Sequence, residues 1–261
     1  MKLTSWSFSK LQIFESCKYR AALQWRDKVP DNQPKTHADR GTQIHQEAED
    51  YVVGKAEPTH NLRFFLDDFG ALAQHFKKGR VTCEEEWGFD KEWRVHAWKT
   101  AWLRLKCDAV CHLTKEHLVV IDYKTGKRFG NEIKHAEQLQ LYALCALIRY
   151  PDIEEVTCEL WYLDQNELAT FTMKRKQLSR YLSIFDKRGI AFTSETIFKP
   201  NPNIHSCKYC PYSPDKQGDC KYGVSQSGSK PDQKICVDTL KLNKKPMKSD
   251  AMFSEADLKG L

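Results

Sequence analysis

The sequence lacks any run of about eighteen apolar residues, the length that a helix needs to cross a bilayer. Its opening stretch, MKLTSWSFSKLQIF, also lacks the apolar block of a secretory signal peptide. We therefore expect a soluble protein of the cytoplasm. No internal repeat is apparent, and 261 residues with 41% hydrophobic content can bury a sizeable core. One compact domain with appendages is expected.

A strong excess of one charge is missing as well. Lys and Arg number 41 against 35 Asp and Glu, which gives a formal net charge of +6. This excess suits a polyanionic partner, but it is far below the charge density of a histone-like protein. Composition alone therefore permits nucleic-acid binding without requiring it.

Hydrophobic periodicity predicts both helices and strands. Helices are expected over residues 5–25, 40–53, 62–76, 135–150 and 175–192, and strands over 81–89, 102–113, 117–124, 155–164 and 167–173. In the second strand, apolar residues alternate with Arg104, Lys106 and Asp108, so one face is expected to be apolar throughout. Residues 223–261 show neither periodicity nor enough apolar residues to pack, and we expect a flexible tail there.

The strand over 117–124 ends in two opposite charges. Residues two apart in a strand share a face, so Asp122 and Lys124 point into the same space. Asp108 can lie beside Asp122 if the two strands form a hairpin around Lys115 and Glu116. Two carboxylates can hold a hard divalent cation, and a lysine can orient a nucleophile, as phosphodiester hydrolysis requires. By itself, an Asp-x-Lys sequence is more often a surface ion pair.

A further ligand is suggested by the helix over 40–53. His45 and Glu49 stand one helical turn apart and share a face. Imidazole suits Mn²⁺ better than Mg²⁺, so the site should accept manganese. The alternative is an ordinary surface histidine.

The order of these motifs resembles the RecB-like PD-(D/E)xK nucleases, which include CRISPR-associated and phage exonucleases. The motifs are Gly41-x-x-x-His45, Asp108, Asp122-Tyr-Lys124-Thr-Gly and Gln138-x-x-x-Tyr142, within residues 7–220 or so. The resemblance implies an α/β (α+β) restriction-endonuclease-like fold. In that fold helices flank a mixed central sheet, with a helical segment before it and a cysteine cluster after it.

The resemblance also implies roles for individual residues. His45, Asp108, Asp122 and the main-chain carbonyl of Tyr123 would bind Mg²⁺ or Mn²⁺, and Lys124 would be catalytic. Gln138 and Tyr142 would assist the site and contact DNA. The chain departs from the family in the Lys-Cys-Asp-Ala setting of Asp108 and in having Asp rather than Glu at position 122. Neither change removes a ligand.

Ten cysteines are many for an intracellular protein, where clustered cysteines more often hold a metal than form disulfides. Cys207, Cys210 and Cys220 lie close together in sequence, and with Cys17 they resemble the family's [4Fe-4S] staple. Four thiolates also suit Zn²⁺, with His205 as a substitute ligand, and spacing does not separate the two. The cysteines within the expected helices and strands are assigned to packing in the core: Cys83, Cys107, Cys111, Cys145 and Cys158. Cys236 lies in the expected tail and receives no role.

Basic residues flank the expected metal site and are candidates for phosphate contacts: Lys106, Lys127, Arg128 and Lys134. They can equally be solvated surface residues. Trp93, Trp98 and Trp102 could stack on unpaired bases, but filling a core is the favoured interpretation.

These expectations give one domain over residues 1–222 and the tail over 223–261. The domain has a helical insertion over about 40–78, a catalytic core over about 81–175 and a cysteine cluster of Cys17 with 205–220. The expected activity is a DNA exonuclease in replication, recombination or repair, in a cell or in the host cytoplasm for a phage. The alternatives are a structure-selective endonuclease and a catalytically silent iron-sulfur DNA-binding scaffold. Besides DNA, we expect replication or recombination proteins as partners, through the tail.

Overall fold

The computed structural model describes residues 2–31, 33–34, 36–126 and 128–225. The chain forms two compact units, Met1–Asn201 and Pro202–Leu261. The expected tail lies outside the described residues from residue 226 onward, as does Cys236. Within the described residues, no helix combines the length and the apolar character needed to cross a membrane.

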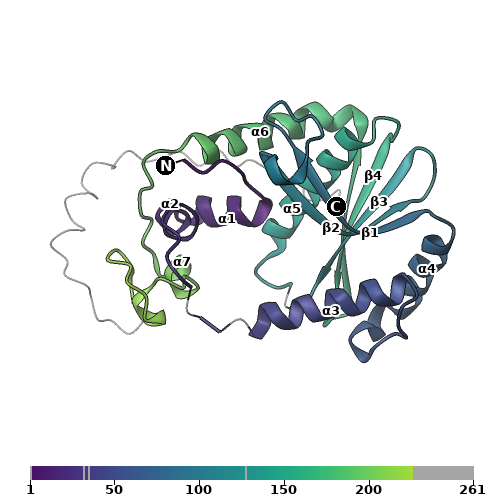
Figure 1. Cartoon of the computed structure of the whole chain (residues 1–261), viewed down its shortest axis with the longest axis horizontal. Coiled ribbons are helices and arrows are strands. Elements are labelled where there is room, and N and C mark those ends of the chain that lie inside the picture. The colour runs from purple at the N-terminus through teal and green to yellow at the C-terminus, as the bar shows by residue number, and fades with distance from the viewer. Residues whose placement is uncertain (1, 32, 35, 127, 226–261) are drawn as a thin grey trace. The chain divides into compact units, whose positions relative to one another are not determined.

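The first unit contains a five-stranded sheet and the helices around it (Figure 1). The strands are β1 (Val81–Phe89), β2 (Leu103–His112), β3 (His117–Lys124), β4 (Glu155–Tyr162) and β5 (Glu167–Lys174). The α-helices are α1 (Phe8–Ser16), α2 (Lys18–Ala21), α3 (Thr36–Val52), α4 (Leu66–Lys77), α5 (Glu132–Arg149) and α6 (Leu178–Ser194). Short 3-10 segments are η2 (His60–Phe65), η3 (Trp98–Thr100) and η4 (Arg175–Gln177), and η1 (Ala22–Arg26) is a π-helix.

The sheet is mixed, and its spatial order follows the sequence, β1-β2-β3-β4-β5. Neighbouring strands are antiparallel except β3 and β4, which are parallel and are connected through α5. A parallel pair needs such a crossover connection, whereas the antiparallel pairs need only short turns. The expected α/β fold with a mixed sheet and flanking helices is confirmed.

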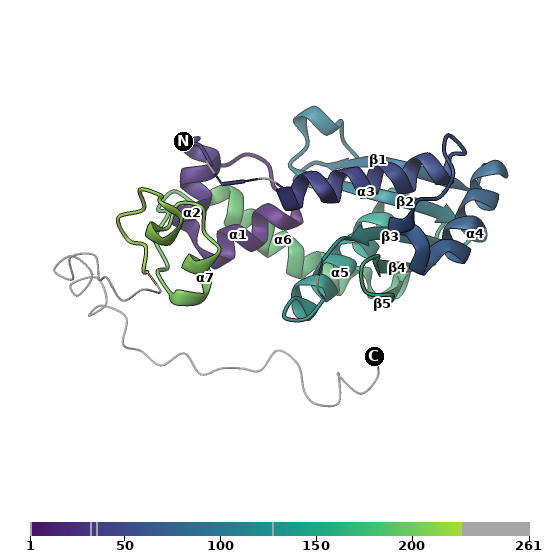
Figure 2. The same ribbon diagram turned by 90° about the horizontal axis from the view of Figure 1, so that it is seen from below.

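Helices cover both faces of the sheet, and each face has its own apolar core. Leu118 and Val120 of β3 pack in a first core with α1, α5 and α6. Ile121 and Tyr123 pack in a second core with α3 and α4. Both α3 and α4 are visible beside the sheet in Figure 2. The candidate residues on helices therefore come from opposite sides of one sheet, with His45 on α3 and Gln138 on α5.

The long helix expected over residues 5–25 is interrupted at Cys17, so that prediction was wrong in part. Cys17 has an extended backbone, with φ −158° and ψ 106°, which separates α1 from α2. The freed carbonyl of Ser16 accepts a hydrogen bond from the Asn201 side chain at 2.9 Å, and the Asn201 N–H donates to Cys17 Sγ at 3.5 Å. Local periodicity does not reveal the break because Asn201 supplies these bonds from a distant part of the chain.

The continuous alternation expected for 102–113 was also wrong, since β2 changes face at Asp108. Leu103, Leu105 and Cys107 belong to the first core, whereas Ala109 and Cys111 belong to the second. A regular strand keeps every second residue on one face. Asp108 thus stands at a local twist of the strand, between the two cores.

Trp93 and Trp102 belong to the first core, which confirms the favoured interpretation for these two. They make edge contacts with each other and with Trp6. Their indole N–H groups donate to Asp186 and to Thr193. Trp98 is half-buried beside the Arg104 guanidinium.

The second unit contains α7 (Ile204–Lys208) and the 3-10 segment η5 (Pro214–Lys216) within its described residues. Asn203 caps α7, because its side chain accepts the Ser206 N–H at 2.8 Å. Cys207 lies in this helix and Cys210 directly after it, and both are buried.

Candidate active site

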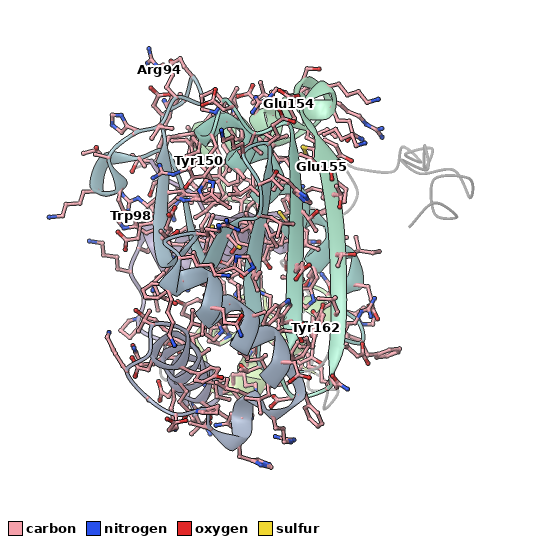
Figure 3. The ribbon with its side chains drawn as sticks, turned by 90° about the vertical axis from the view of Figure 1, so that its right-hand side faces the viewer. Arg94, Trp98, Tyr150, Glu154, Glu155 and Tyr162 are labelled. Atoms are coloured by element: carbon pink, nitrogen blue, oxygen red, sulfur yellow. The ribbon has the colours of Figure 1, made fainter. Side chains whose placement is uncertain are left out.

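The candidate residues gather at one end of β3. Lys124 is the last residue of β3 and pairs with Tyr162, the last residue of β4. Figure 3 shows Tyr162 at the opposite end of the sheet from Glu155, where β4 begins. The β2–β3 ladder runs only as far as Ala109↔Ile121. The sheet therefore opens between these two strands immediately before Asp108 and Asp122.

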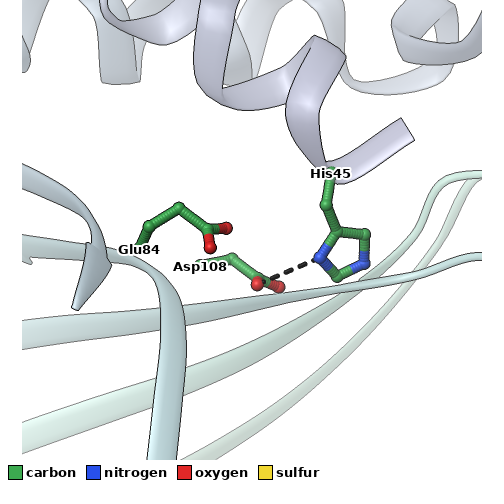
Figure 4. Close-up of side chains that lie close together, drawn as sticks. All are labelled: His45, Glu84 and Asp108. Atoms are coloured by element: carbon green, nitrogen blue, oxygen red, sulfur yellow. Dashed lines mark hydrogen bonds and ion pairs between the residues drawn. The ribbon is translucent and has the colours of Figure 1, made fainter. Parts of the chain in front are cut away.

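A group of three ligand-type side chains, which we call the histidine group, lies on the Asp108 side of this opening (Figure 4). It consists of His45 from α3, Glu84 from β1 and Asp108 from β2, whose ligand atoms lie within 4.8 Å of one another. His45 Nδ1 is 3.0 Å from Asp108 Oδ1. Glu49, one turn after His45 on α3, accepts a hydrogen bond from Gln46 at 3.1 Å, and the second acid of the group is Glu84 of β1.

Glu84 is the residue that the sequence interpretation missed. It has a left-handed backbone, with φ 56°, in the middle of a strand. Such a conformation costs a residue with a side chain about 1–2 kcal/mol, and strain of this kind collects at functional sites. A signal was present in the sequence, because three consecutive glutamates at 84–86 are unusual inside a strand.

Gly41 explains how α3 approaches the site closely enough to bring His45 there. A Cβ atom at position 41 would lie 3.1 Å from Thr125 Oγ1, just beyond the end of β3. With a larger residue at this position, the Thr125 side chain would have to shift by a few tenths of an ångström. The Gly41-x-x-x-His45 spacing thus has a packing reason.

The pKa values of Asp108 and His45 are both raised in the histidine group. Burial and the nearby Asp122 carboxylate raise the pKa of Asp108, against the opposing effect of His45. Burial lowers the pKa of His45, but the hydrogen bond and the charge of Asp108 outweigh it, and the net pKa is raised. The pair therefore retains a proton more readily than either side chain would in water.

A second group, which we call the lysine group, surrounds Asp122. Lys124 forms an ion pair with Asp122 Oδ2. Gln138 Nε2 donates to Asp122 Oδ1 at 3.1 Å, and the Tyr142 hydroxyl donates to the same oxygen at 2.9 Å. Gln138 and Tyr142 are one turn apart on α5, so they approach the carboxylate together. Burial raises the pKa of Tyr142 well above its usual range, which keeps the phenol a donor.

A main-chain hydrogen bond connects the two groups. The Tyr123 N–H donates to Asp108 Oδ2 at 2.6 Å, whereas a regular ladder would supply a carbonyl there. The Tyr123 side chain packs in the second core against Phe69 and Trp161. Because Tyr123 lies between Asp122 and Lys124, this bond fixes the histidine group relative to the end of β3. The carbonyl of Tyr123 as a ligand stays a prediction.

His135 is a further polar residue that the sequence interpretation did not single out. Its Nδ1 lies 2.5 Å from the Tyr162 hydroxyl, and it precedes Gln138 by three residues on the same face of α5. Burial and the charge of Lys124 lower its pKa, so His135 is neutral near pH 7. The lysine group is therefore bordered by a neutral imidazole.

The basic residues predicted to contact phosphates differ in whether an acidic side chain pairs with them. Lys106 forms an ion pair with Glu84, which raises the Lys106 pKa. Arg128 pairs with Glu167 at 3.2 Å. Lys134 is exposed on the first turns of α5. Lys127 lies outside the described residues, so its contribution stays a prediction.

The four cysteines expected to hold a cluster lie in different units. Cys17 is half-buried in the first unit, at the break between α1 and α2. In the second unit, the Cys210 N–H donates to the Cys207 carbonyl at 3.0 Å, and the Cys220 N–H donates to the Tyr212 carbonyl at 2.9 Å. The turn at Cys207–Cys210 and the return of the chain at Cys220 fix the local backbone of three thiols. A shared metal centre with Cys17 stays a prediction.

The cysteines assigned to packing are mostly within the apolar cores. The buried ones are Cys107, Cys111, Cys145 and Cys158. Cys83 is only half-buried, and burial raises its pKa to about 12. Its thiol is therefore protonated at neutral pH.

The donor set of the histidine group fits a divalent cation. Oxygen ligands suit Mg²⁺ and Mn²⁺, and an imidazole is acceptable to Mn²⁺. A cation would also stabilise the Asp108 carboxylate against burial and the charge of Asp122, which together raise its pKa. Next to it, the lysine group offers an ammonium and two neutral donors held by Asp122. The arrangement can bind an anion beside a cation.

Comparisons with known proteins identify this architecture. A family model described as the PD-(D/E)XK nuclease superfamily matches residues 5–214. No curated protein matches the sequence.

Several solved structures resemble the chain, including the following three. A protein designated SSO0001 is 16% identical, with 86% of this chain and 90% of that chain covered and a TM-score of 0.45. A candidate exonuclease from Eubacterium rectale is 10% identical, with coverages of 76% and 84% and a TM-score of 0.45. An alkaline exonuclease from Laribacter hongkongensis is 9% identical, with coverages of 74% and 91% and a TM-score of 0.28.

Proposed function

Since the chain belongs to the PD-(D/E)XK nuclease superfamily, we propose that it is a RecB-like, divalent-metal-dependent exonuclease that hydrolyses DNA. The observation that carries the proposal is the convergence of two acids and a histidine beside an aspartate-bound lysine. An ordinary surface ion pair does not bring together a buried carboxylate and donors from α3, β1, β2 and α5.

His45, Glu84 and Asp108, whose ligand atoms lie together, would hold the cation. The motif resemblance adds Asp122 and the Tyr123 carbonyl as further ligands. When bound, Mg²⁺ or Mn²⁺ supplies positive charge that polarises the scissile phosphate and makes water easier to deprotonate. The Tyr123 N–H holds Asp108 in place through Oδ2, which leaves Oδ1 facing His45. The ligand carboxylate is thus oriented before any cation arrives.

Lys124 would orient the attacking water and offset the charge that develops on the phosphate. Its ammonium is held by Asp122 Oδ2 at the end of a strand, so it is positioned with little freedom. Preorganised charge of this kind contributes more than a flexible surface lysine would. Gln138 and Tyr142 would fix Asp122 by occupying its other oxygen and would border the DNA strand.

We further propose that Cys17, Cys207, Cys210 and Cys220 hold a [4Fe-4S] cluster, with Zn²⁺ as the alternative. The local turns that fix Cys207, Cys210 and Cys220 support this assignment. Such a centre would stabilise the fold. The enzyme would act in the cytoplasm, of the host if a phage encodes it, in replication, recombination or repair.

The test of the function uses purified protein with end-labelled linear DNA and circular single-stranded DNA, with and without Mn²⁺. We expect Mn²⁺-dependent loss of the linear substrate only, because an exonuclease needs an end. Cleavage of the circle would show the structure-selective endonuclease instead. No cleavage of either substrate, together with DNA binding, would show the silent scaffold.

Variants of the lysine group connect that activity to the site. Asp122→Ala and Lys124→Ala should abolish cleavage while circular dichroism shows an intact fold. Lys187→Ala is a matched control, since Lys187 lies on α6 and is exposed. Unchanged cleavage in either lysine-group variant would remove this active site from consideration.

A further inference from the structure

The segment between β3 and α5 presents a phenylalanine to solvent. Phe129 is 88% exposed, and Ile133, four residues later in the first turn of α5, is 78% exposed. These are the two most exposed large apolar side chains among the described residues. Both follow Lys124 and precede Gln138, so they lie in the connection between two parts of the lysine group.

Phe129 stands on a turn that is anchored at both ends. The Asn131 N–H donates to the Arg128 carbonyl at 3.0 Å, which closes a β-turn over Phe129 and Gly130. Gly130 has φ 81°, the value that the third residue of a type II turn requires and that glycine adopts without strain. Phe129 is therefore the second residue of a defined turn.

Both ends of this turn are held by other elements. The Arg128 N–H donates to Gln165 Oε1 at 2.9 Å, and its guanidinium bonds Glu167 of β5. On the other side, the His135 N–H donates to the Asn131 carbonyl at 2.9 Å, which joins the turn to α5. The backbone that carries Phe129 is thus held by hydrogen bonds although the side chain is 88% exposed.

Packing does not explain this arrangement. Burying a phenylalanine would stabilise the fold by about 1.5–3 kcal/mol, and the anchored turn forgoes that gain. An aromatic ring on a fixed backbone suits stacking, because little freedom is lost when a partner binds. The charges around the turn are mixed, since Lys134 and Glu132 are both exposed and Arg128 pairs with Glu167. Charge therefore does not select the partner, and the exposed ring is what carries the inference.

We propose that Phe129 stacks on an unpaired base of the DNA substrate, with Ile133 at the edge of that contact. The proposal rests on the proposed nuclease function and deepens it by assigning the substrate class. In duplex DNA both faces of each internal base are covered by its neighbours, whereas an unpaired base exposes a face to an aromatic side chain. The enzyme therefore prefers single-stranded or frayed DNA.

The position of the turn agrees with such a contact. Five residues separate Lys124 from Phe129, so their Cα atoms are at most about 17 Å apart. Ile133 precedes Gln138 by five residues, or about 7.5 Å along the axis of α5. Phosphates along one strand of DNA are spaced by about 3.4 Å in the duplex and by more when the strand is extended. The stacked base lies within about five nucleotides of the scissile phosphate.

The test measures binding without cleavage, by fluorescence anisotropy in EDTA, for the full-length chain. The probes are a single-stranded oligonucleotide and a blunt hairpin duplex of equal charge. Phe129→Ala should weaken single-strand binding about tenfold, within the range that stacking of one base supplies. Phe129→Tyr should retain the affinity, and binding of the duplex should change less than about twofold.

Phe64→Ala is the matched control. Phe64 is also an exposed phenylalanine beside an arginine, with the Arg63 guanidinium 4.1 Å from its ring centroid. This variant should bind both probes as the unaltered chain does. A second readout is 2-aminopurine in the single strand, whose quenching by the protein should decrease in Phe129→Ala.

Three results would overturn the inference. One is unchanged single-strand binding in Phe129→Ala, and another is an equal loss for both probes. The third is Phe129→Leu binding as tightly as Phe129→Tyr, which would indicate an apolar contact with the DNA that does not need an aromatic ring. Absence of any DNA binding by the unaltered chain would overturn both this inference and the nuclease. Loss of cleavage alone would leave the stacking contact standing.

Discussion

Glu84 stands directly opposite Asp108 across β1 and β2, although the ladder skips that pair. The register passes from Cys83↔Ala109 to Glu85↔Cys107. On β1 the left-handed backbone of Glu84 changes the face of the sheet to which the following side chains point. On β2 the same change of face occurs at Asp108. Both strands therefore twist at the same point, and both present an acid there.

Replacing Glu84 by asparagine should increase stability and remove activity. Asparagine tolerates the left-handed conformation, so relief of about 1 kcal/mol of strain is expected, or a rise of about 2–4 °C in Tm. The same change removes a ligand, so cleavage with Mn²⁺ should fall by more than roughly a hundredfold.

Glu86→Asn provides the comparison, since Glu86 is exposed on the same strand and has an ordinary backbone. Its Tm should change by less than about 1–2 °C and its cleavage rate should not change. A drop in Tm for Glu84→Asn would contradict the assignment of strain to this position.

The metal-free protein should lose stability as pH rises above about 6.5. A histidine whose pKa is raised on folding contributes stability below its unfolded pKa of about 6.5, and this contribution is lost as pH rises through the folded pKa. The raised pKa of Asp108 has the same sign, because the folded state retains the proton longer than the unfolded chain.

Thermal unfolding of EDTA-treated protein across this pH range measures the effect, with His45→Asn expected to flatten the curve. Mn²⁺ should reverse the loss at high pH, since deprotonated ligands bind the cation and binding stabilises the folded state. If Tm instead rises with pH in EDTA, the folded state does not retain a proton on His45 and Asp108 as inferred.

Tyr142→Phe should slow cleavage and destabilise the fold. The change leaves Asp122 Oδ1 with Gln138 as its remaining donor in a buried place, at a cost of about 1–3 kcal/mol. We expect kcat to fall roughly tenfold or more, because each factor of ten corresponds to about 1.4 kcal/mol.

Tyr181→Phe is the suitable control, since Tyr181 is half-buried on α6 and makes a ring contact with Phe171. If Tyr142→Phe cleaved at the unaltered rate, the hydroxyl would have only a structural part in the lysine group.

Anaerobically purified protein should contain iron and acid-labile sulfide, with a visible absorption band that dithionite bleaches. Serine at Cys17, Cys207, Cys210 or Cys220 should each reduce the iron content, because four thiolates complete a cluster. Cys83→Ser should retain it, since Cys83 lies on β1 and packs against the second apolar core. Zinc in place of iron would select the alternative, and neither metal would end the assignment.

Much of the fold was readable because strands carry local signals. β1 and β3 begin and end where the apolar pattern predicted, and the β2–β3 hairpin pairs Ala109 with Ile121 as the expected turn requires. The break at Cys17 was not readable, because Asn201 makes it and lies far away in sequence.

The candidate site was readable where one segment carries several groups. Asp122 and Lys124 occupy one strand, and Gln138 and Tyr142 occupy one turn of a helix. Glu84 escaped because its proximity to Asp108 depends on strand pairing, and because its backbone departs from the strand pattern on which the interpretation relied. His135 escaped for a similar reason, since its partner Tyr162 lies on another strand.

The shared twist in β1 and β2 restricts how the lengths of these strands can change. If one residue were deleted from β1 between its start and Glu84, Glu84 would no longer stand opposite Asp108. The β1 side chains on one side of the deletion would then point to the opposite face of the sheet. A compensating deletion in the facing half of β2 would restore the alignment. Viable length variants of this protein should therefore carry matched insertions or deletions in the two strands, and single ones should fail to fold.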